Sequence, residues 1–118
     1  MTVELEIYDV GEAVAASGSS KQSSIVATYD ELVAVFGEDA NIGSSDKVTT
    51  EFRVEILVRD LELEVEDIVM STIYDWKEES PDTCRTGEYT WHVGGFGNEA
   101  AWYIQDLLDV YRQHHIAA

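Results

Sequence analysis

Residues 50–58, Thr-Glu-Phe-Arg-Val-Glu-Ile-Leu-Val, decide the fold of this chain. Apolar and charged side chains alternate along them. The apolar set is Phe52, Val54, Ile56 and Val58, and the charged set is Glu51, Arg53 and Glu55. A period of two residues is typical of a β-strand that has one face in the core and the other in water. The stretch therefore predicts a strand within an alternating run from Lys47 to Val58.

The same alternation recurs elsewhere in the chain. Residues 3–7, 61–65 and 89–93 each predict a further strand. Residues 68–76 form a β-rich run, which predicts a strand that is covered on both faces. Three segments rich in turn-forming residues separate the predicted elements, the first of them a long loop or a weak helix. These segments are residues 11–24, 41–46 and 77–88.

Two helices are predicted from capping signals and apolar stripes. Thr28 and Glu31 form a capping box, and Gly37 stands where a C-terminal cap belongs, so a short helix lies between them. Its apolar face comprises Tyr29, Leu32, Val33 and Phe36. Asn98 is a suitable N-cap for a longer closing helix. The apolar stripe of that helix comprises Ala101, Ile104, Leu108 and Tyr111.

The order of these elements predicts the fold class. The length of 118 residues indicates a single domain over residues 1–118. Because the strands are consecutive and the helices lie outside them, the class is α+β. We expect an antiparallel meander sheet of about four to five strands, with a short helix before it and a longer C-terminal helix packed on one face.

The charge balance is strongly acidic. The chain has 24 aspartates and glutamates against seven lysines and arginines, a formal net charge of −17. Molar salt screens the repulsion between unpaired carboxylates, so the composition resembles that of proteins from halophilic archaea and their viruses. Two other interpretations stay open: the charge mimics nucleic acid and attracts basic partners, or it keeps a small protein in solution. Direct binding to nucleic-acid phosphates is disfavoured, because it requires a basic stripe.

The location of the protein is predicted from two features. Cys84 is the only cysteine, which excludes an intramolecular disulfide and favours a reducing compartment. Residues 1–6 lack the basic start and the apolar stretch of a signal peptide. No apolar run approaches the roughly 20 residues of a membrane-spanning helix. We therefore expect a cytoplasmic protein without a membrane partner, in the host cytoplasm if the protein is viral.

Four short motifs resemble those of a known family. They are Phe36-Gly37, Lys47 with Glu51-Phe52, Ile73-Tyr74-Asp75-Trp76-Lys77, and Trp91-His92-Val93-Gly94-Gly95. Together they resemble small proteins of tailed phages and other viruses, which carry Lys-x-x-x-Glu-Trp, Ile-Tyr-Asp-Trp/Tyr-Lys and Trp-His-Ile-Gly-Gly before a last helix. Phe52 stands where the family has Trp, and residues 59–66 are longer than its Asp-Gly hairpin. The resemblance begins after residue 25, and it implies a viral or provirus origin, here in a halophilic version, without a particular chemistry.

Two of these motifs supply a candidate binding site. If their strands are neighbours, Tyr74, Trp76 and His92 gather on one sheet face, where they can stack a base and neutralise a phosphate with lysine. The candidate ligand-binding residues are Lys47, Arg53, Tyr74, Trp76, Lys77 and His92. A structural interpretation competes with this one: the aromatic rings fill the core, Asp75 caps a turn, and His92 donates to a backbone carbonyl.

Other motifs carry less weight. Residues 94–97 are interpreted as a tight turn between strand and helix, because they lack the full glycine pattern of a dinucleotide-binding loop. Arg85 beside Cys84 is expected to lower the pKa of the thiol, yet a pair of Cys84 with His92 rests on closeness in sequence alone. An incidental thiol is the simpler interpretation. No catalytic residue, metal site or cofactor is predicted.

The function class that these features favour is a non-enzymatic binding or interaction protein, a small viral or provirus factor that acts on a host component. One alternative is a binder of a small nucleotide-like ligand, or an enzyme that acts on one. Another is a structural component of the virion. The partner is thus a host protein or a nucleotide-like ligand. Trp102 and Tyr103 flank the stripe of the closing helix, so a homo-oligomer through that helix is a further hypothesis.

Overall fold

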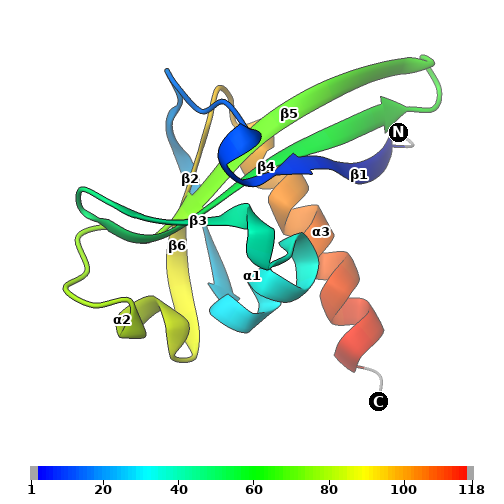
Figure 1. Ribbon diagram of the computed structural model, residues 1–118. Helices are drawn as coiled ribbons and strands as arrows, with labels where there is room; N and C mark the ends of the chain where they lie inside the picture. Colours follow the sequence, from blue (N-terminus) through cyan, green and yellow to red (C-terminus); the bar gives the residue numbers. More distant parts are fainter. Residues whose placement is uncertain (1–2, 117–118) are drawn as a thin grey trace.

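Six strands form one antiparallel sheet in the computed structural model, which describes residues 3–116 (Figure 1). They are β1 (Val3–Val10), β2 (Ser20–Thr28), β3 (Asn41–Ser45), β4 (Val48–Asp60), β5 (Val65–Tyr74) and β6 (Glu88–Gly95). Their order across the sheet is β1-β4-β5-β6-β2, and β3 pairs with β4 as well. The expected α+β class with an antiparallel sheet is confirmed, with six strands in place of four to five.

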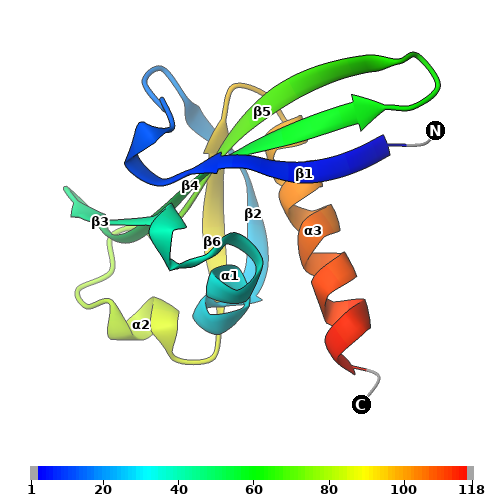
Figure 2. The ribbon, with the colours of Figure 1, turned by 45° about the vertical axis from the view of Figure 1, so that its right-hand side comes forward.

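Helices cover one face of this sheet. They are α1 (Tyr29–Phe36), α2 (Asp82–Arg85) and α3 (Glu99–Ile116), with short 3-10 turns η1 (Gly11–Ala13) and η2 (Glu38–Ala40). Figures 1 and 2 show α1 and α3 on the same side of the sheet. Ile104 and Leu108 of α3 are fully buried in the core, together with Trp91 of β6. The expected packing of the C-terminal helix on one face is therefore confirmed.

The alternation in β4 has the predicted consequence, whereas the predicted strand of residues 68–76 is buried in its middle but exposed at Ile68 and Trp76. Phe52 and Val54 are fully buried, whereas Arg53 between them is partly exposed. In β5, the four residues Met70–Ile73 are all buried. On one face the Ser71 hydroxyl donates to the Ala100 carbonyl of α3, and on the other face Thr72 lies beside the segment of residues 12–20. Both faces of β5 are therefore covered there, and neither can carry a charge without a partner.

Two strands lie where the sequence predicts loops or turns. β2 begins inside the predicted loop of residues 11–24, and β3 occupies the predicted turn of residues 41–46. β2 pairs with β6 from Ser20↔Gly95 to Thr28↔Glu88. Most of its polar side chains face water at the edge of the sheet, so pairing with a distant strand outweighs a weak local preference.

The first helix has the predicted ends. The Thr28 hydroxyl accepts a hydrogen bond from the Glu31 N–H at 3.0 Å, and the Thr28 N–H donates to the Glu31 carboxylate at 2.9 Å. Gly37 ends the helix with φ of 89°, a conformation that favours glycine, and its N–H donates to the Val33 carbonyl. These bonds satisfy backbone groups that every helix end leaves open.

The outer parts of three strands extend beyond the rest of the sheet. β6 pairs with β5 only from Ser71 to Tyr74, whereas β1, β4 and β5 continue past it. We call this three-stranded extension the arm; it comprises residues 3–7, 56–60 and 65–69. Figure 1 shows the arm projecting away from α2 and from the C-terminal end of α3.

Candidate functional site

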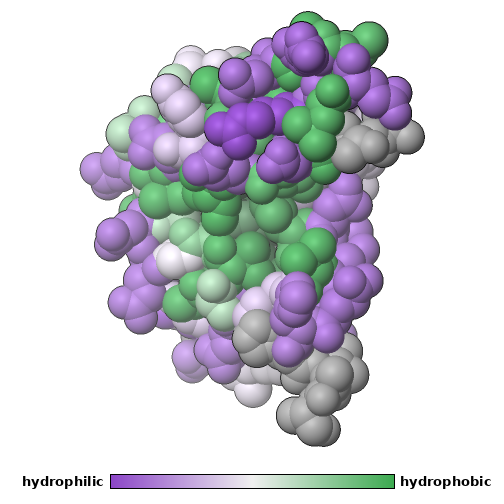
Figure 3. All heavy atoms as spheres, turned by 90° about the vertical axis from the view of Figure 1, so that its right-hand side faces the viewer, coloured by the Kyte–Doolittle hydropathy of each residue, from purple (hydrophilic) through white to green (hydrophobic). Residues whose placement is uncertain are grey.

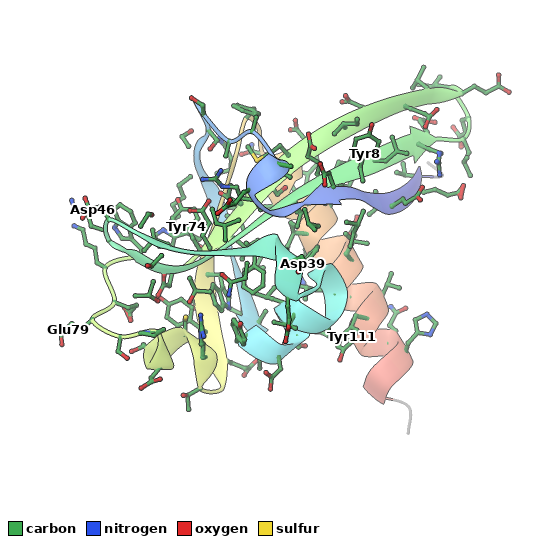
Figure 4. The ribbon with its side chains drawn as sticks, in the orientation of Figure 1. Tyr8, Asp39, Asp46, Tyr74, Glu79 and Tyr111 are labelled. Atoms are coloured by element: carbon green, nitrogen blue, oxygen red, sulfur yellow. The ribbon has the colours of Figure 1, made fainter. Side chains whose placement is uncertain are left out.

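Three aromatic side chains gather on the sheet face opposite the core. Tyr74 of β5 and His92 of β6 are cross-strand partners, with ring centroids 5.4 Å apart and planes at 69°. Trp76 lies directly after β5, and its centroid is 6.3 Å from each of these rings. Ile73 points into the core, so Tyr74 beside it points to the other face. Figure 4 shows Tyr74 near the middle of the sheet.

Two lysines flank Trp76. The Nζ atoms of Lys47 and Lys77 each lie 5.9 Å from the centroid of the indole, within the range of a cation–π contact. Both residues have left-handed backbones, with φ of 63° and 57°, and the Lys77 N–H donates to the Lys47 carbonyl at 2.7 Å. Such conformations cost on the order of 1 kcal/mol and cluster at functional sites. The backbone thus holds Lys47 and Lys77 next to each other and close to Trp76.

The third lysine of the chain lies beside the same cluster. Lys21 of β2 is paired with Gly94 of β6. Burial of the imidazole lowers the pKa of His92, and the positive charge of Lys21 lowers it further. Lys21 was not among the predicted ligand-binding residues. The scarcity of lysine was a usable signal for it, because the chain has only three lysines, at positions 21, 47 and 77.

These lysines differ in their partners from three of the four arginines. The ion pairs among residues 3–116 all use arginines, namely Arg53, Arg59 and Arg112. Within that part of the chain, therefore, no lysine is paired with a carboxylate. Arg53 was a predicted ligand-binding residue, and its Nε lies 2.6 Å from the Glu51 carboxylate. Its charge is consequently offset by that of Glu51, whereas the charges of the lysines are not offset in this way.

A pocket of about 630 Å³ opens beside this cluster. One wall is the segment of residues 12–20, which is anchored by the buried side chain of Val14. The opposite wall comes mainly from β4 and β5, and it comprises Val48, Glu51, Arg53, Thr72, Tyr74, Trp76 and Gly94. The volume lies within the range of small-molecule sites. Lys47, Lys77 and His92 stand outside the lining, but each contacts Trp76, which belongs to it.

The paired glycines of the Trp-His-Val-Gly-Gly motif make room for two neighbours. A Cβ atom at Gly94 would lie 2.6 Å from the Thr72 hydroxyl and 3.4 Å from the Tyr74 ring. A Cβ atom at Gly95 would lie 2.6 Å from the Ala100 Cβ and 3.0 Å from the Met70 carbonyl. Gly94 therefore makes room for the Thr72 hydroxyl, with the Tyr74 ring at contact distance, and Gly95 lets the first turn of α3 approach the sheet.

Asp75 fixes the position of the residues around it. Its side chain is fully buried and accepts hydrogen bonds from the N–H groups of Thr49 at 2.8 Å and Thr50 at 3.0 Å, and from the Thr49 hydroxyl. These bonds join the end of β5 to the start of β4. Because Trp76 follows Asp75 and Lys47 stands just before β4, the buried carboxylate fixes the backbones of Trp76 and Lys47 relative to each other.

Cys84 departs from its predicted environment. It lies on α2 instead of in a polar loop, and its side chain is fully buried in the core. Burial raises the pKa of the thiol, opposite to the lowering expected from Arg85. The guanidinium of Arg85 instead lies 4.6 Å from the centroid of the Tyr29 ring. Since His92 is on the other face of the sheet, the two residues form no Cys–His pair.

Within residues 3–116, no group of three or more histidines, cysteines and carboxylates is placed to hold a metal ion. In the same part of the chain, no helix is both long enough and apolar enough to cross a membrane. No protein-family model, curated protein or solved structure matches this sequence. The resemblance to small viral proteins therefore stays a prediction, and the site is interpreted from its own geometry.

Proposed function

We propose that this protein is a binding protein for a small planar anion of the nucleotide type. The ligand would occupy the lysine–aromatic patch, which we define as Lys21, Lys47, Tyr74, Trp76, Lys77 and His92. The observation that carries the proposal is the gathering of all three lysines of a chain with net charge −17 around one aromatic cluster. An acidic surface repels anions, so such a cluster is the one place where the lysine charges favour an anion.

Trp76, Lys47 and Lys77 have distinct roles in this proposal. Trp76 is 40% exposed, so its indole is accessible for stacking on a base or a similar ring. The ammonium groups of Lys47 and Lys77 stand beside that ring, where they neutralise a phosphate or carboxylate. The adjacent pocket offers space for the remainder of the ligand.

The proposed role is capture without turnover. In a virus or provirus of a salt-rich host, such a protein would sequester a nucleotide-like signal of the host cell. The lysines support the capture of an anion, because within residues 3–116 they are paired with no carboxylate and lose no partner when a ligand binds. An enzymatic alternative predicts consumption of the bound nucleotide and the loss of that activity in a His92→Ala variant.

Isothermal titration in molar potassium chloride tests the proposal, with nucleoside 5′-monophosphates compared with the matching nucleosides. We expect saturable binding of at least one nucleotide, and weaker binding of its nucleoside. Trp76→Ala should weaken nucleotide binding about fivefold or more, since stacking on an aromatic ring contributes about 1–3 kcal/mol per base. Arg59→Gln removes one positive charge on the arm and should leave the affinity unchanged. Equal binding of nucleotides and nucleosides, or an unaltered Trp76→Ala variant, would refute the proposal.

A further inference from the structure

β1 is an open edge of the sheet. It pairs with β4 from Val3↔Asp60 to Val10↔Val54, and no second strand within residues 3–116 pairs with it. Along an antiparallel strand, backbone N–H and C=O groups face the partner strand and the open side in alternation. β1 therefore presents unpaired backbone groups along its outer side, and an edge of this kind accepts a further strand.

Charges alternate across the outer face of the arm. Arg59 of β4 lies between Glu6 of β1 and Glu66 of β5, at 3.1 Å and 3.2 Å. The order from β5 to β1 is thus acid, base, acid, and a basic side chain beyond Glu6 would continue it. Glu4 is also exposed on β1, in register with Arg59. A strand with basic residues on this face would complement both glutamates.

The opposite face of β1 is apolar. Val3, Leu5 and Ile7 are half-buried against the core. Figure 3 shows apolar side chains gathered over a broad area at this end of the molecule, with hydrophilic side chains around them. Because successive residues of a strand point to opposite faces, a strand beside β1 would bring every second side chain to this apolar face.

A second copy of β1 does not complement this edge. Antiparallel pairing of β1 with itself would bring Glu4 and Glu6 of one copy near those of the other. Like charges in opposed positions destabilise a strand pair. The edge is complemented instead by a strand whose apolar side chains meet Val3, Leu5 and Ile7 and whose basic side chains meet the two glutamates.

From these features we infer that β1 binds an extended segment of another protein in which apolar residues alternate with arginine or lysine. The segment adds to the sheet as a seventh strand, in the order partner-β1-β4-β5. This surface is distinct from the lysine–aromatic patch, because β4 separates β1 from β5 and β6, which position that patch. The acidic arm thus serves a basic protein partner, and the inference does not depend on the proposed anion binding.

The test uses the whole protein and a synthetic peptide of alternating valine and arginine with the length of β1, 8 residues. Two further peptides carry backbone N-methyl groups, one on the valines alone and one on the arginines alone. The side chains are unchanged, but each peptide loses the hydrogen-bond donors of one edge. We expect one methylated peptide to bind like the parent and the other to lose at least about tenfold in affinity. Equal affinities of the two, whether retained or lost, would overturn the inference.

Matched protein variants separate the proposed edge from general attraction to an acidic surface. The double variant Glu4→Gln, Glu6→Gln removes two charges from β1, and Glu62→Gln, Glu79→Gln removes two exposed charges elsewhere. In molar salt, where the screening length is about 3 Å, the first should weaken the parent peptide several-fold and the second should not. Thermal unfolding of both variants shows whether each is folded. Equal weakening by two folded variants would contradict binding at the edge of β1.

Discussion

The imidazole of His92 stacks on the indole of Trp76, with ring centroids 6.3 Å apart and planes inclined at 24°. Partial burial, followed by the charge of Lys21, lowers the pKa of His92 from its usual value of 6.5. The folded protein therefore disfavours the imidazolium. The stability that follows from this lowered pKa is present above pH 6.5 and is lost as the pH falls through the folded pKa.

An anion in the lysine–aromatic patch would oppose that lowering, because it stabilises a protonated His92. Binding is then coupled to proton uptake, and we expect affinity to rise as the pH falls below 6.5. A nucleoside 3′,5′-cyclic monophosphate suits the measurement, since its phosphodiester does not titrate in this range. Titrations at several pH values around and below 6.5 should show this rise in affinity for the unaltered protein and no rise for His92→Gln. The same trend in both proteins would assign the titration to another group.

The three lysines should contribute separately to anion affinity. Asparagine adopts left-handed backbones more readily than most residues, so Lys47→Asn and Lys77→Asn remove the charge and preserve φ of 63° and 57°. We expect each variant, and Lys21→Gln, to weaken binding about two- to fivefold, as for an exposed charge pair of roughly 0.5–1 kcal/mol. Calorimetric titration measures the change. Unchanged affinity in all three variants would remove the lysines from the site.

Asp75 should be the most sensitive position for stability near the site. Asp75→Ala leaves the N–H groups of Thr49 and Thr50 without their acceptor inside the protein. Hydrogen bonds to a charged group contribute about 1.5–3 kcal/mol each, so we expect a loss of about 3 kcal/mol in the free energy of unfolding. Denaturant unfolding of this variant, beside the exposed control Asp82→Ala, measures it. A loss equal to that of the control would contradict the anchoring role.

The two glycines of the motif should respond differently to alanine. Gly95→Ala brings a methyl group against the Ala100 Cβ and the Met70 carbonyl, so it should lower the free energy of unfolding by about 1–3 kcal/mol. Gly94→Ala brings a methyl group 2.6 Å from the Thr72 hydroxyl, a side-chain atom that can move aside, so it should cost less stability and mainly disturb the pocket wall to which Thr72 belongs, weakening anion binding. Unfolding curves and ligand titrations of both variants separate the effects. A larger loss in the free energy of unfolding for Gly94→Ala than for Gly95→Ala would contradict these roles of the two glycines.

Stability should depend strongly on salt. With a net charge of −17, repulsion between carboxylates opposes folding in dilute buffer, and molar salt screens it. We expect Tm to rise by several degrees or more between about 0.1 M and 2 M potassium chloride. Potassium chloride is preferable to sulfate for this purpose, because sulfate also strengthens apolar burial. A Tm that is independent of potassium chloride would favour the interpretations of the acidity other than salt adaptation.

Local pattern was sufficient around Phe52 and Thr28, but it was wrong for residues 61–65, where alternation predicts a strand and residues 61–64 form the turn between β4 and β5. The alternation around Phe52 predicts a strand with the correct faces, and Thr28 with Glu31 predicts the start of α1. β2 was not predicted, because its serines are weak strand formers and its stability comes from pairing with β6, as in Ser24↔His92. That pairing joins residues far apart in sequence, which no local pattern reveals.

The candidate site follows the same division. Tyr74, Trp76 and His92 were predicted to gather on one sheet face if their strands are neighbours. The pairing of β5 with β6 meets that condition. Lys21 was missed because its place beside Gly94 depends on the pairing of β2. The alternation also places Glu51 and Arg53 on one exposed strand face, but it does not predict their ion pair.

The most direct test of the account is a two-dimensional NMR titration of the ¹⁵N-labelled protein with a nucleoside 3′,5′-cyclic monophosphate. The chain has three tryptophans, so three indole signals report on three environments. Trp91 is buried and donates to the Ala27 carbonyl, and Trp102 lies 62% exposed on α3, so both serve as internal controls. The account predicts a saturable shift of the Trp76 indole, assigned with Trp76→Phe, while the other two stay in place. An unmoved Trp76 signal at saturating ligand, or shifts confined to Trp102, would contradict it.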